Sequence, residues 1–386
     1  MKACGIIAEF DPFHNGHKYL LSQARALGCT HIAVAMSGSA VQRGMPAFLD
    51  KYTRAALALD NGADLVLELP APFSCSSAEI FAKAGVSALA ALGEGAVTRL
   101  VFGSETDDTD LIVSASLAAD ALKDSETVRR LHQCGESYPS AVSKACAEEF
   151  GSEVASVFES PNSTLALEYC RALGKIAPFT EPCAVKRAGA PHDSTVPSEG
   201  FASASMLREL IARGEDVSDY MPAPAEDPCI VERLDSVFLY HLLAADRQQL
   251  ISLPDVSEAL ADRILKTAEA PFDSTAAFLA ACKSRNITLA RLRRMALHLV
   301  LGVRKEDIAP LPYVRVLALN TRGRELLSAG EPTLPIDTSL ARLEKTSPFA
   351  QRVSLIERRA SALRALGTAS KKTENDYKAK IRLKKD

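Results

Sequence analysis

The sequence predicts an α/β protein in which a doubly wound parallel sheet is followed by a mainly α-helical region. Three observations favour this fold class. Between residues 5 and 105, four short apolar runs alternate with amphipathic helical segments, as in βαβ units. A proline-rich segment, 220–228, then interrupts the chain. Beyond it, helical periodicity continues but strand patterns mostly vanish.

Each predicted strand is a short apolar run that stops at a proline, a glycine or a charged residue. The first begins at Gly5 and ends before Asp11-Pro12. The others are expected at 31–36, 63–69, 99–102 and 183–187. Because parallel strands need long crossover connections, helices should join them. These helices are expected at 16–26, 50–60, 77–92 and 164–173.

Three further helices form a predicted insertion before the last strand, at about 107–123, 126–134 and 139–150. A helix from Ser203 to Gly214 closes the first domain, 1–222. The second domain, 223–370, should be mainly α-helical, with helices at 234–244, 257–269, 274–285, 289–301 and 355–366. The lysine-rich tail, 371–386, has few apolar residues and should be mobile.

Composition limits the class of protein. No apolar run is long enough to cross a membrane, and the N-terminus lacks the basic and apolar segments of a signal peptide. The nine cysteines form no Cys-x-x-Cys pair, which predicts reduced thiols, no zinc site and no metal held by the protein itself. We therefore expect a cytoplasmic protein with no membrane partner.

The net charge of −3 is unevenly distributed. Residues 1–222 contain 18 Lys/Arg and 28 Asp/Glu, a balance of −10, whereas residues 223–386 contain 27 and 20, a balance of +7. A basic half joined to an acidic half indicates a polyanionic partner such as a nucleic acid. Charge alone supports equally well the alternative that these are ordinary solvated helix faces.

The strongest motif is His14-x-Gly16-His17, which follows the first strand directly and opens the first helix. A helix N-terminus presents free backbone N–H groups, so this position suits a phosphate. Gly16 has no Cβ and lets the backbone approach the phosphates. The alternative is that both histidines only cap the helix, but their spacing and their place after a strand favour a phosphate site.

A second candidate phosphate contact begins at Ser203. Ser203 is expected to cap its helix, which leaves the hydroxyl of Ser205 and the first-turn N–H groups available, with Arg208 one turn further on. The pattern Ser-x-Ser-x-x-Arg is weak by itself, because many helices begin in this way. Together with the two upstream histidines it resembles the second signature of the nucleotidylyltransferase superfamily, which clamps β- and γ-phosphates.

Two other polar segments stand where ligands bind in parallel sheets. Gln42-Arg43-Gly44 lies in a polar loop after the second strand. Asn162 opens a helix, where it is either a simple N-cap or a contact to a nucleotide.

Four cations also lie near predicted strand ends or helix starts. Lys51 and Arg54 oppose the dipole of their helix, so an anion or a local carboxylate should answer them. Lys186 and Arg187 are either a solvated strand end or, as their position favours, a contact to an anion.

The second domain carries candidate RNA contacts. Arg291 and Arg294 lie on a basic helix, and Arg315 lies close to the aromatic ring of Tyr313. Such cations with an aromatic nearby suit contacts to an RNA backbone. The alternatives are a charged helix face and a short core strand.

Over most of its length the chain resembles the bacterial tRNA(Met) cytidine acetate ligases, a family of the H-x-G-H nucleotidylyltransferase superfamily. The segments that carry this resemblance are 5–17, 36–38, 42–44, 62–70, 102–105, 160–162, 202–208, 291–295 and 312–315. Together they are far more specific than H-x-G-H alone. The resemblance implies a Rossmann-like nucleotidylyltransferase domain followed by an α-helical tRNA-binding domain.

The resemblance also implies an ATP-dependent ligase. ATP would activate acetate as acetyl-adenylate, and N4 of the wobble cytidine of elongator tRNA(Met) would attack it to give N4-acetylcytidine. Mg²⁺ would be carried with the ATP. The implied catalytic residues are His14, His17 and Ser205. The implied ATP-binding residues are Ile7, Ala8, Glu9, Phe10, Asp11, Pro12, Phe13, His14, Asn15, Gly16, His17, Lys18, Tyr19, Leu20, Gly103, Asn162, Arg187 and Ser205.

The sequence departs from the family pattern at two places. Asp11 stands where Asn is usual, so its carboxylate must pair with a cation or face the adenine or ribose. Ser163-Thr164 stand where further Asn/Ile residues are usual. These departures concern the role of Asp11 itself more than the presence of an ATP site.

Two other functions stay open. A small-molecule nucleotidylyltransferase that acts on a phosphorylated cofactor precursor fits both phosphate motifs but not the basic helical domain. A non-catalytic, ATP-responsive RNA-binding protein would bind tRNA and turn nothing over. The sequence leaves open the acetate pocket, the tRNA nucleotides that are read, the oligomeric state, and the order of tRNA binding and adenylate formation.

Overall fold

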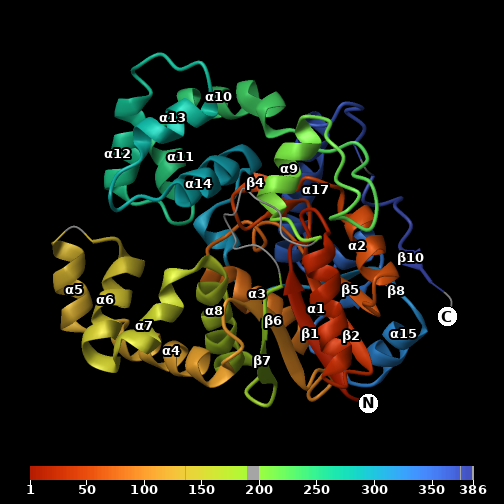
Figure 1. Cartoon of the computed structure of the whole chain (residues 1–386). Helices are drawn as coiled ribbons and strands as arrows, with labels where there is room; N and C mark the ends of the chain where they lie inside the picture. Colours follow the sequence, from red (N-terminus) through yellow and green to blue (C-terminus); the bar gives the residue numbers. More distant parts are fainter. Residues whose placement is uncertain (135, 189–199, 374, 385–386) are drawn as a thin grey trace.

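The central feature of the fold is one mixed β-sheet with helices on both faces (Figure 1). The computed structural model describes residues 1–134, 136–188, 200–373 and 375–384. The strands follow the order β10-β8-β5-β2-β1-β6-β7, and β9 pairs with β8. Their bounds are Ala3–Ala8 (β1), His31–Ser37 (β2), Leu65–Leu69 (β5), Arg99–Ser104 (β6), Glu181–Lys186 (β7), Val314–Leu319 (β8), Ile336–Asp337 (β9) and Arg382–Leu383 (β10).

The sheet confirms the predicted α/β class and adds strands that run opposite to the parallel ones: β8 and its two parallel neighbours, β9 and β10. Strands β5, β2, β1, β6 and β7 run parallel, whereas β8 runs antiparallel to β5. Strand β8 comes from 223–370, the range expected to be a separate helical domain, so the sheet extends across the expected boundary at 222. All residues of β8 are buried. This agrees with the short core strand that the sequence analysis gave as the alternative to an RNA contact at Arg315.

Alternate residues of each parallel strand face opposite sides of the sheet, and each side has its own hydrophobic core. On one side, Ile6 packs in the same cluster as residues of α1 (Asn15–Ala26) and α2 (Lys51–Asp60). On the other side, Ile7 packs with residues of α3 (Ala78–Ala90) and α8 (Pro161–Ile176). Covering both faces leaves the ends of the strands as the place for a ligand.

Helices separate β6 from β7, as the sequence predicts for an insertion, and they form the lobe at the lower left of Figure 1. In this lobe Glu136 accepts a hydrogen bond from Arg285 at 2.6 Å, which ties it to the second helical region. The helices of the insertion are α4 (Thr109–Leu122), α5 (Glu126–Gln133), α6 (Tyr138–Phe150) and α7 (Ser152–Ser156).

The second helical region has a hydrophobic cluster of its own, which includes Phe238, Phe278 and Leu292. Helix α17 (Pro348–Leu366) joins this cluster to the sheet, because Ile356 packs with the helices and Val353 packs with the sheet core. The helices here are α10 (Asp235–Ala244), α11 (Arg247–Ser252), α12 (Glu258–Thr267), α13 (Thr275–Cys282) and α14 (Leu289–Leu301), with α15 (Thr321–Ser328) and α16 (Leu340–Leu343) closer to the sheet.

The C-terminal segment 375–384 is attached to the rest of the molecule. Asp376 is 4% exposed, and its carboxylate lies 2.7 Å from the Lys51 ammonium and 2.8 Å from the Arg315 guanidinium. Further on, β10 pairs with β8. Residues 375–384, within the tail 371–386 that the sequence predicts to be mobile, thus contact the rest of the molecule, because Asp376 supplies a negative charge to two buried cations.

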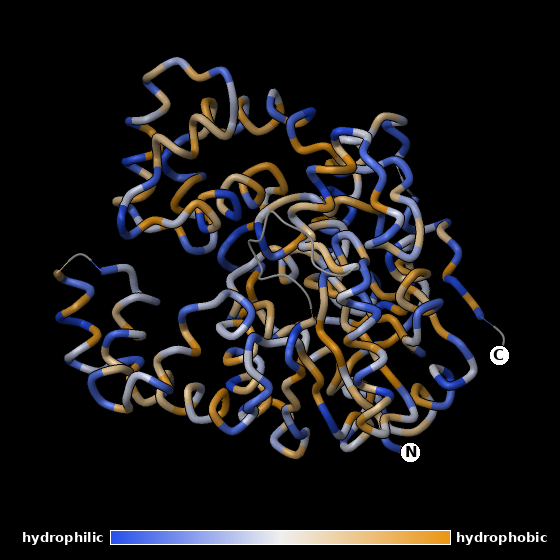
Figure 2. Tube along the Cα trace, viewed as in Figure 1, coloured by the Kyte–Doolittle hydropathy of each residue, from blue (hydrophilic) through white to orange (hydrophobic). Residues whose placement is uncertain are grey.

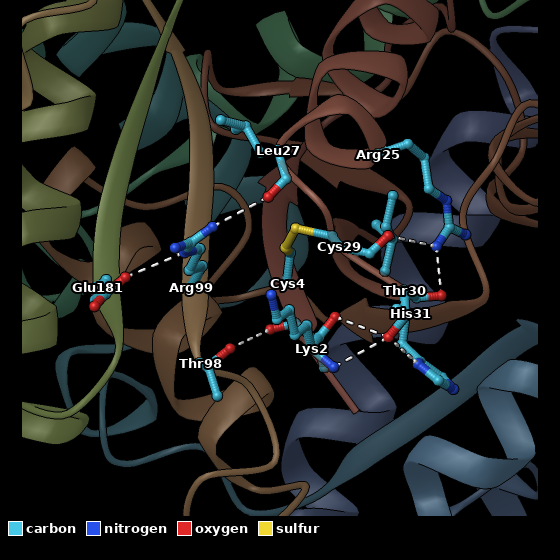
Figure 3. Close-up of a disulfide and its surroundings, with 12 residues drawn as sticks. Lys2, Cys4, Arg25, Leu27, Cys29, Thr30, His31, Thr98, Arg99 and Glu181 are labelled. Atoms are coloured by element: carbon cyan, nitrogen blue, oxygen red, sulfur yellow. Dashed lines mark hydrogen bonds and ion pairs between the residues drawn. A yellow bond between two sulfur atoms is a disulfide. The ribbon is translucent and has the colours of Figure 1, made fainter.

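Hydrophobic residues follow the strands at the centre of the molecule (Figure 2). Among the described helices, none combines the length and the apolar character that a bilayer span requires. Cys4 of β1 and Cys29, just after α1, form a disulfide (Figure 3). The expectation of reduced thiols is therefore wrong for this pair, because the residues are far apart in sequence and only the fold of β1 against α1 brings them together.

Candidate active site

The turn between β1 and α1 holds the two histidines of the motif. His14 is the N-cap of α1, and its Nδ1 accepts a hydrogen bond from the backbone N–H of Gly16 at 3.0 Å. His17 closes the reciprocal bond, because its Nδ1 accepts from the N–H of His14 at 3.2 Å. This is a capping box built from imidazoles. A Cβ on Gly16 would lie 2.8 Å from His14 Cε1, so the absence of a side chain there also makes room for the imidazole.

Both histidines are set to donate a hydrogen bond outward. Since each Nδ1 accepts a backbone N–H, the proton of each neutral ring lies on Nε2. Burial, helped by the charges of Arg187 and Arg208, lowers the pKa of His14 to about 3. Burial and the neighbouring His14 and Arg187 hold the pKa of His17 well below its usual value. The capping role and the ligand role are therefore compatible, because they use different nitrogens.

Helix α9 (Ala204–Ala212) brings a hydroxyl and a guanidinium toward this turn. Ser203 is its N-cap and accepts from Met206 N–H at 3.2 Å, as predicted. Ser205 does not cap the helix. Its Oγ accepts hydrogen bonds from Arg43 at 2.9 Å and from Arg208 at 3.2 Å. Arg208 also donates to the backbone carbonyl of Asp11 at 2.5 Å, which fixes α9 against the turn.

The structure explains the aspartate that replaces the usual asparagine. The Asp11 carboxylate accepts from Phe48 N–H at 2.6 Å and lies 3.8 Å from the Arg208 guanidinium. Glu9, two residues earlier, accepts from Gln42 N–H at 2.6 Å. Both carboxylates on the turn therefore serve the protein backbone, and a cation stands beside Asp11, as the sequence requires.

On the other side of β1, the ends of β6 and β7 meet the start of α8. The N-cap of α8 is Ser160, whereas Asn162 donates its amide to the Glu105 carboxylate at 2.7 Å. Glu105 also accepts from the hydroxyls of Ser160 and Ser163 at 2.6 and 2.8 Å. The N-cap interpretation of Asn162 is thus wrong. Glu105 connects the end of β6 to the start of α8, and the sequence analysis did not identify this role.

Gly103 and Arg187 lie together at this corner. A Cβ on Gly103 would lie 3.4 Å from the Cγ of Arg187, so the glycine leaves space beside the arginine stem. Lys186 and Arg187 both reach the surface, and partial burial of the Arg187 guanidinium lowers its pKa. The residues implied to bind ATP beyond the first turn therefore come from three neighbouring elements: β6, β7 and α8.

Few side chains of the stretch 7–20 point to solvent. Ile7, Phe10 and Phe13 belong to the hydrophobic cores. Asn15 donates to the carbonyls of Gly200 and Asp219, both at 2.9 Å. Lys18 is exposed, while Ala8, Tyr19 and Leu20 are half-buried. Any ATP contact along this stretch would thus rest mainly on the backbone and on the two imidazoles, and the individual assignments stay predictions.

The cations at the start of α2 are answered within the protein. Lys51 is fully buried among the carboxylates of Glu68, Asp376 and Glu357 at 2.5, 2.7 and 2.9 Å. Arg54 donates to backbone carbonyls, among them that of Ser37 at 2.9 Å. Of the two explanations that the sequence allows for Lys51, the local carboxylate is the one observed.

The three candidate RNA contacts lie in different environments. Arg291 is half-buried and donates from Nε and Nη2 to the Asp255 carbonyl at 3.0 and 2.5 Å. Arg294 is half-buried, and its Nε lies in the interior. Arg315 is 1% exposed and bonded to Asp376. The structure therefore places Arg315 in the core, away from any RNA, because β8 lies inside the sheet between β5 and β10 and is buried along its length.

Comparison with known proteins agrees with this geometry. The model of the HIGH nucleotidyl transferase family matches residues 1–380. A tRNA(Met) cytidine acetate ligase of Syntrophotalea carbinolica is 37% identical over 364 residues, which cover 89% of this chain and 86% of that protein. One of Staphylococcus saprophyticus is 30% identical and covers 99% of both chains.

Solved structures extend the likeness to the whole fold. The crystal structure of apo Thermotoga maritima TmcAL has a TM-score of 0.91 at 28% identity, with all of both chains covered. The structure of the same protein bound with α-thio ATP has a TM-score of 0.88 at 27% identity, again over both whole chains.

Proposed function

The chain belongs to the HIGH nucleotidyl transferase family and, within it, to the tRNA(Met) cytidine acetate ligases, and we propose that it is an ATP-dependent ligase that acetylates tRNA. It activates acetate as acetyl-adenylate and transfers the acetyl group to N4 of the wobble cytidine of elongator tRNA(Met). The product is N4-acetylcytidine.

One structural observation supports this proposal most strongly. His14, His17 and Ser205 each have their acceptor lone pairs engaged by protein donors, at Nδ1 of the imidazoles and at Oγ of the serine. The hydrogen-bonding groups that remain on these three side chains are donors: two Nε2–H groups and one O–H. A set of donors at a helix N-terminus, with Arg208 beside it, suits a polyphosphate.

In the first step an acetate oxygen forms a bond to the α-phosphorus of ATP, and the bond from that phosphorus to the pyrophosphate oxygen breaks. Pyrophosphate leaves with the bonding pair. His14 and His17 donate to the α-phosphate oxygens, where negative charge increases in the transition state. Ser205 and Arg208 hold the departing pyrophosphate in line. Gly103, Asn162 and Arg187 contact the nucleotide from the β6–β7 side.

Mg²⁺ would be bound mainly by the phosphates. In the described part of the chain no group of three or more His, Cys, Asp or Glu side chains is arranged to hold a metal ion. The carboxylates of Glu9 and Asp11 accept backbone N–H groups. This donor set fits a cation that arrives with ATP, whose role would be to neutralise phosphate charge.

In the second step the exocyclic N4 of cytidine attacks the acetyl carbonyl. The carbon–oxygen bond to AMP breaks, AMP leaves with the bonding pair, and N4 loses a proton. Because an acyl-adenylate is already reactive, this step depends mostly on the position of the cytidine. Helix α14, which carries Arg291 and Arg294, is the proposed tRNA contact, and the cytoplasm is the proposed location.

The test uses the purified chain with ATP–Mg²⁺, isotopically labelled acetate and unmodified bulk tRNA, followed by nucleoside analysis. The expected result is labelled N4-acetylcytidine that requires ATP. Release of pyrophosphate without label in RNA would indicate a small-molecule nucleotidylyltransferase instead. Binding of tRNA without either product would indicate a non-catalytic RNA-binding protein.

A further inference from the structure

A short hairpin stands beside the histidines, on the side of β1 opposite to β6 and β7. Its strands are β3 (Ala40–Val41) and β4 (Met45–Pro46), and the Gly44 N–H closes the turn on the Val41 carbonyl at 2.9 Å. The turn itself is Gln42-Arg43-Gly44. The residues implied to bind ATP do not include it, although it contacts both the β1–α1 turn and α9.

Two hydrogen bonds, one from a backbone N–H and one from a side chain, tie this turn to the candidate active site. The Gln42 N–H donates to the Glu9 carboxylate at 2.6 Å, and Arg43 donates to Ser205 Oγ at 2.9 Å. The charge of Arg43 also contributes, after burial, to the lowered pKa values of Arg187 and Arg208. The charge of Arg43 therefore opposes those of both Arg187 and Arg208, an arrangement that an anionic ligand would stabilise.

Helix α14 supports the turn from the opposite side. Gly44 has φ +78°, and a Cβ there would lie 2.6 Å from the Arg293 carbonyl carbon and 2.7 Å from Arg294 Cα. The backbone of the turn thus rests directly on the backbone of α14. At the base of the hairpin, the Glu357 carboxylate of α17 accepts from Ser39 N–H at 2.8 Å. The second helical region therefore holds the hairpin in place.

The contact at Ser205 has a specific chemical consequence. A serine hydroxyl has two acceptor lone pairs and one hydrogen. Arg43 and Arg208 occupy both lone pairs, so the remaining direction of Oγ is the one that carries the hydrogen. Without Arg43 the hydroxyl could rotate, and its hydrogen would have no fixed direction.

We propose that Arg43 is a positioning residue for the adenylation step: it orients the Ser205 hydroxyl toward the departing pyrophosphate, and α14 fixes Arg43 through the close contact at Gly44. This inference rests on the function proposed above. It assigns to the helix with the candidate RNA contacts a second task, which is to support the chemistry of ATP.

The experiment measures acetate-dependent exchange of labelled pyrophosphate into ATP, with no tRNA present. Arg43→Ala should lower the kcat of exchange by about tenfold to a hundredfold, below the loss from removing a transition-state donor outright. The KM for ATP should change little, and Arg43→Lys should restore part of the rate because it keeps one charged donor. Gly44→Ala should lower the rate as well, because its Cβ displaces the turn from α14.

Matched controls separate these effects from strain and from loss of charge. Gly95→Ala imposes a similar backbone cost, at φ +70° with no atom within 4 Å, and should leave exchange unchanged. Arg213→Ala removes an arginine that is 63% exposed at the end of α9, and should do the same. Thermal melting of all variants confirms that they are folded.

A second readout distinguishes positioning from general damage. Supplied acetyl-adenylate bypasses the departure of pyrophosphate, so Arg43→Ala should still acetylate tRNA from it at close to the wild-type rate. Exchange by Arg43→Ala and Gly44→Ala at the wild-type rate would overturn the inference, and so would an equal loss in both steps. A wild-type protein without acetate-dependent exchange, both without and with added tRNA, would instead reject the proposed function.

Discussion

Two groups of charged side chains lie at the same end of the sheet and use their cations in opposite ways. The buried ion cluster consists of Lys51, Glu68, Arg315, Glu357 and Asp376, where each cation contacts carboxylates at 2.5–3.6 Å. The phosphate-facing cluster consists of His14, His17, Arg43, Ser205 and Arg208. Its two arginines donate to neutral oxygens, the Ser205 hydroxyl and the Asp11 carbonyl, and the Asp11 carboxylate lies 3.8 Å from Arg208.

The difference shows how a structural cation can be told from one that serves a ligand. Although burial opposes it, the carboxylates of Glu357, Glu68 and Asp376 hold the pKa of Lys51 well above its usual value. In the phosphate-facing cluster, burial lowers the pKa of Arg208 despite the nearby Asp11. A cation compensated by the fold stabilises the fold, whereas cations that donate to neutral acceptors are ready for an anion.

The largest expected effect is the loss of stability when Lys51 is replaced. Lys51→Met removes the cation that Glu68, Asp376 and Glu357 share, while Arg315 still pairs with Glu68 and Asp376. This loss should lower the free energy of unfolding by about 3–5 kcal/mol. Urea denaturation measures this change. Lys83→Met is the control, because Lys83 forms an exposed pair with Glu79 and should cost at most about 1 kcal/mol. A similar cost for both variants would mean that the buried ion cluster does not stabilise the fold.

Replacing His17 should act on chemistry instead of folding. His17→Ala removes one Nε2–H donor, so acetate-dependent pyrophosphate exchange should fall by about 10²–10³-fold. The lost half of the capping box should cost about 1 kcal/mol of stability, small enough for the protein to stay folded. His132→Ala, at an exposed position on α5, is the control and should keep full exchange. An active His17→Ala protein would exclude this role for the imidazole.

The parts of the molecule that the sequence predicted are those set by local pattern. The parallel strands follow from short apolar runs, and the cap at Ser203 follows from its place before an apolar helix. The motif of His14 and His17 could be assigned because a spacing of three residues places both rings on one helical turn. In each of these cases the pattern that identifies the element lies within a few residues.

What the sequence could not predict depends on partners far away in the chain. Arg315 resembled an RNA contact because the carboxylate that neutralises it, Asp376, lies 61 residues further on. Lys51 meets Glu357 across 306 residues. The tail was expected to be mobile because its lysines are visible in the sequence, whereas the burial of Asp376 is not. Cations can be sorted into structural and ligand-binding ones only when such pairs are known.

Whether a cation already has a partner within the protein also selects the arginine expected to contact RNA. This prediction has the smallest expected effect. Arg293 is exposed on α14, whereas Arg291 is bonded to the Asp255 carbonyl and Arg315 is buried. Arg293→Ala should therefore weaken tRNA binding several-fold and reduce the slope of log affinity against log salt by about one, as for the loss of one phosphate contact. ATP binding should not change.

Filter binding at several salt concentrations gives the slope. The matched control is Arg247→Ala, which removes an exposed arginine paired with Asp262 and Glu258. If the control alters the slope as much as Arg293→Ala, the contact is diffuse attraction to a basic region and α14 is not a specific RNA surface.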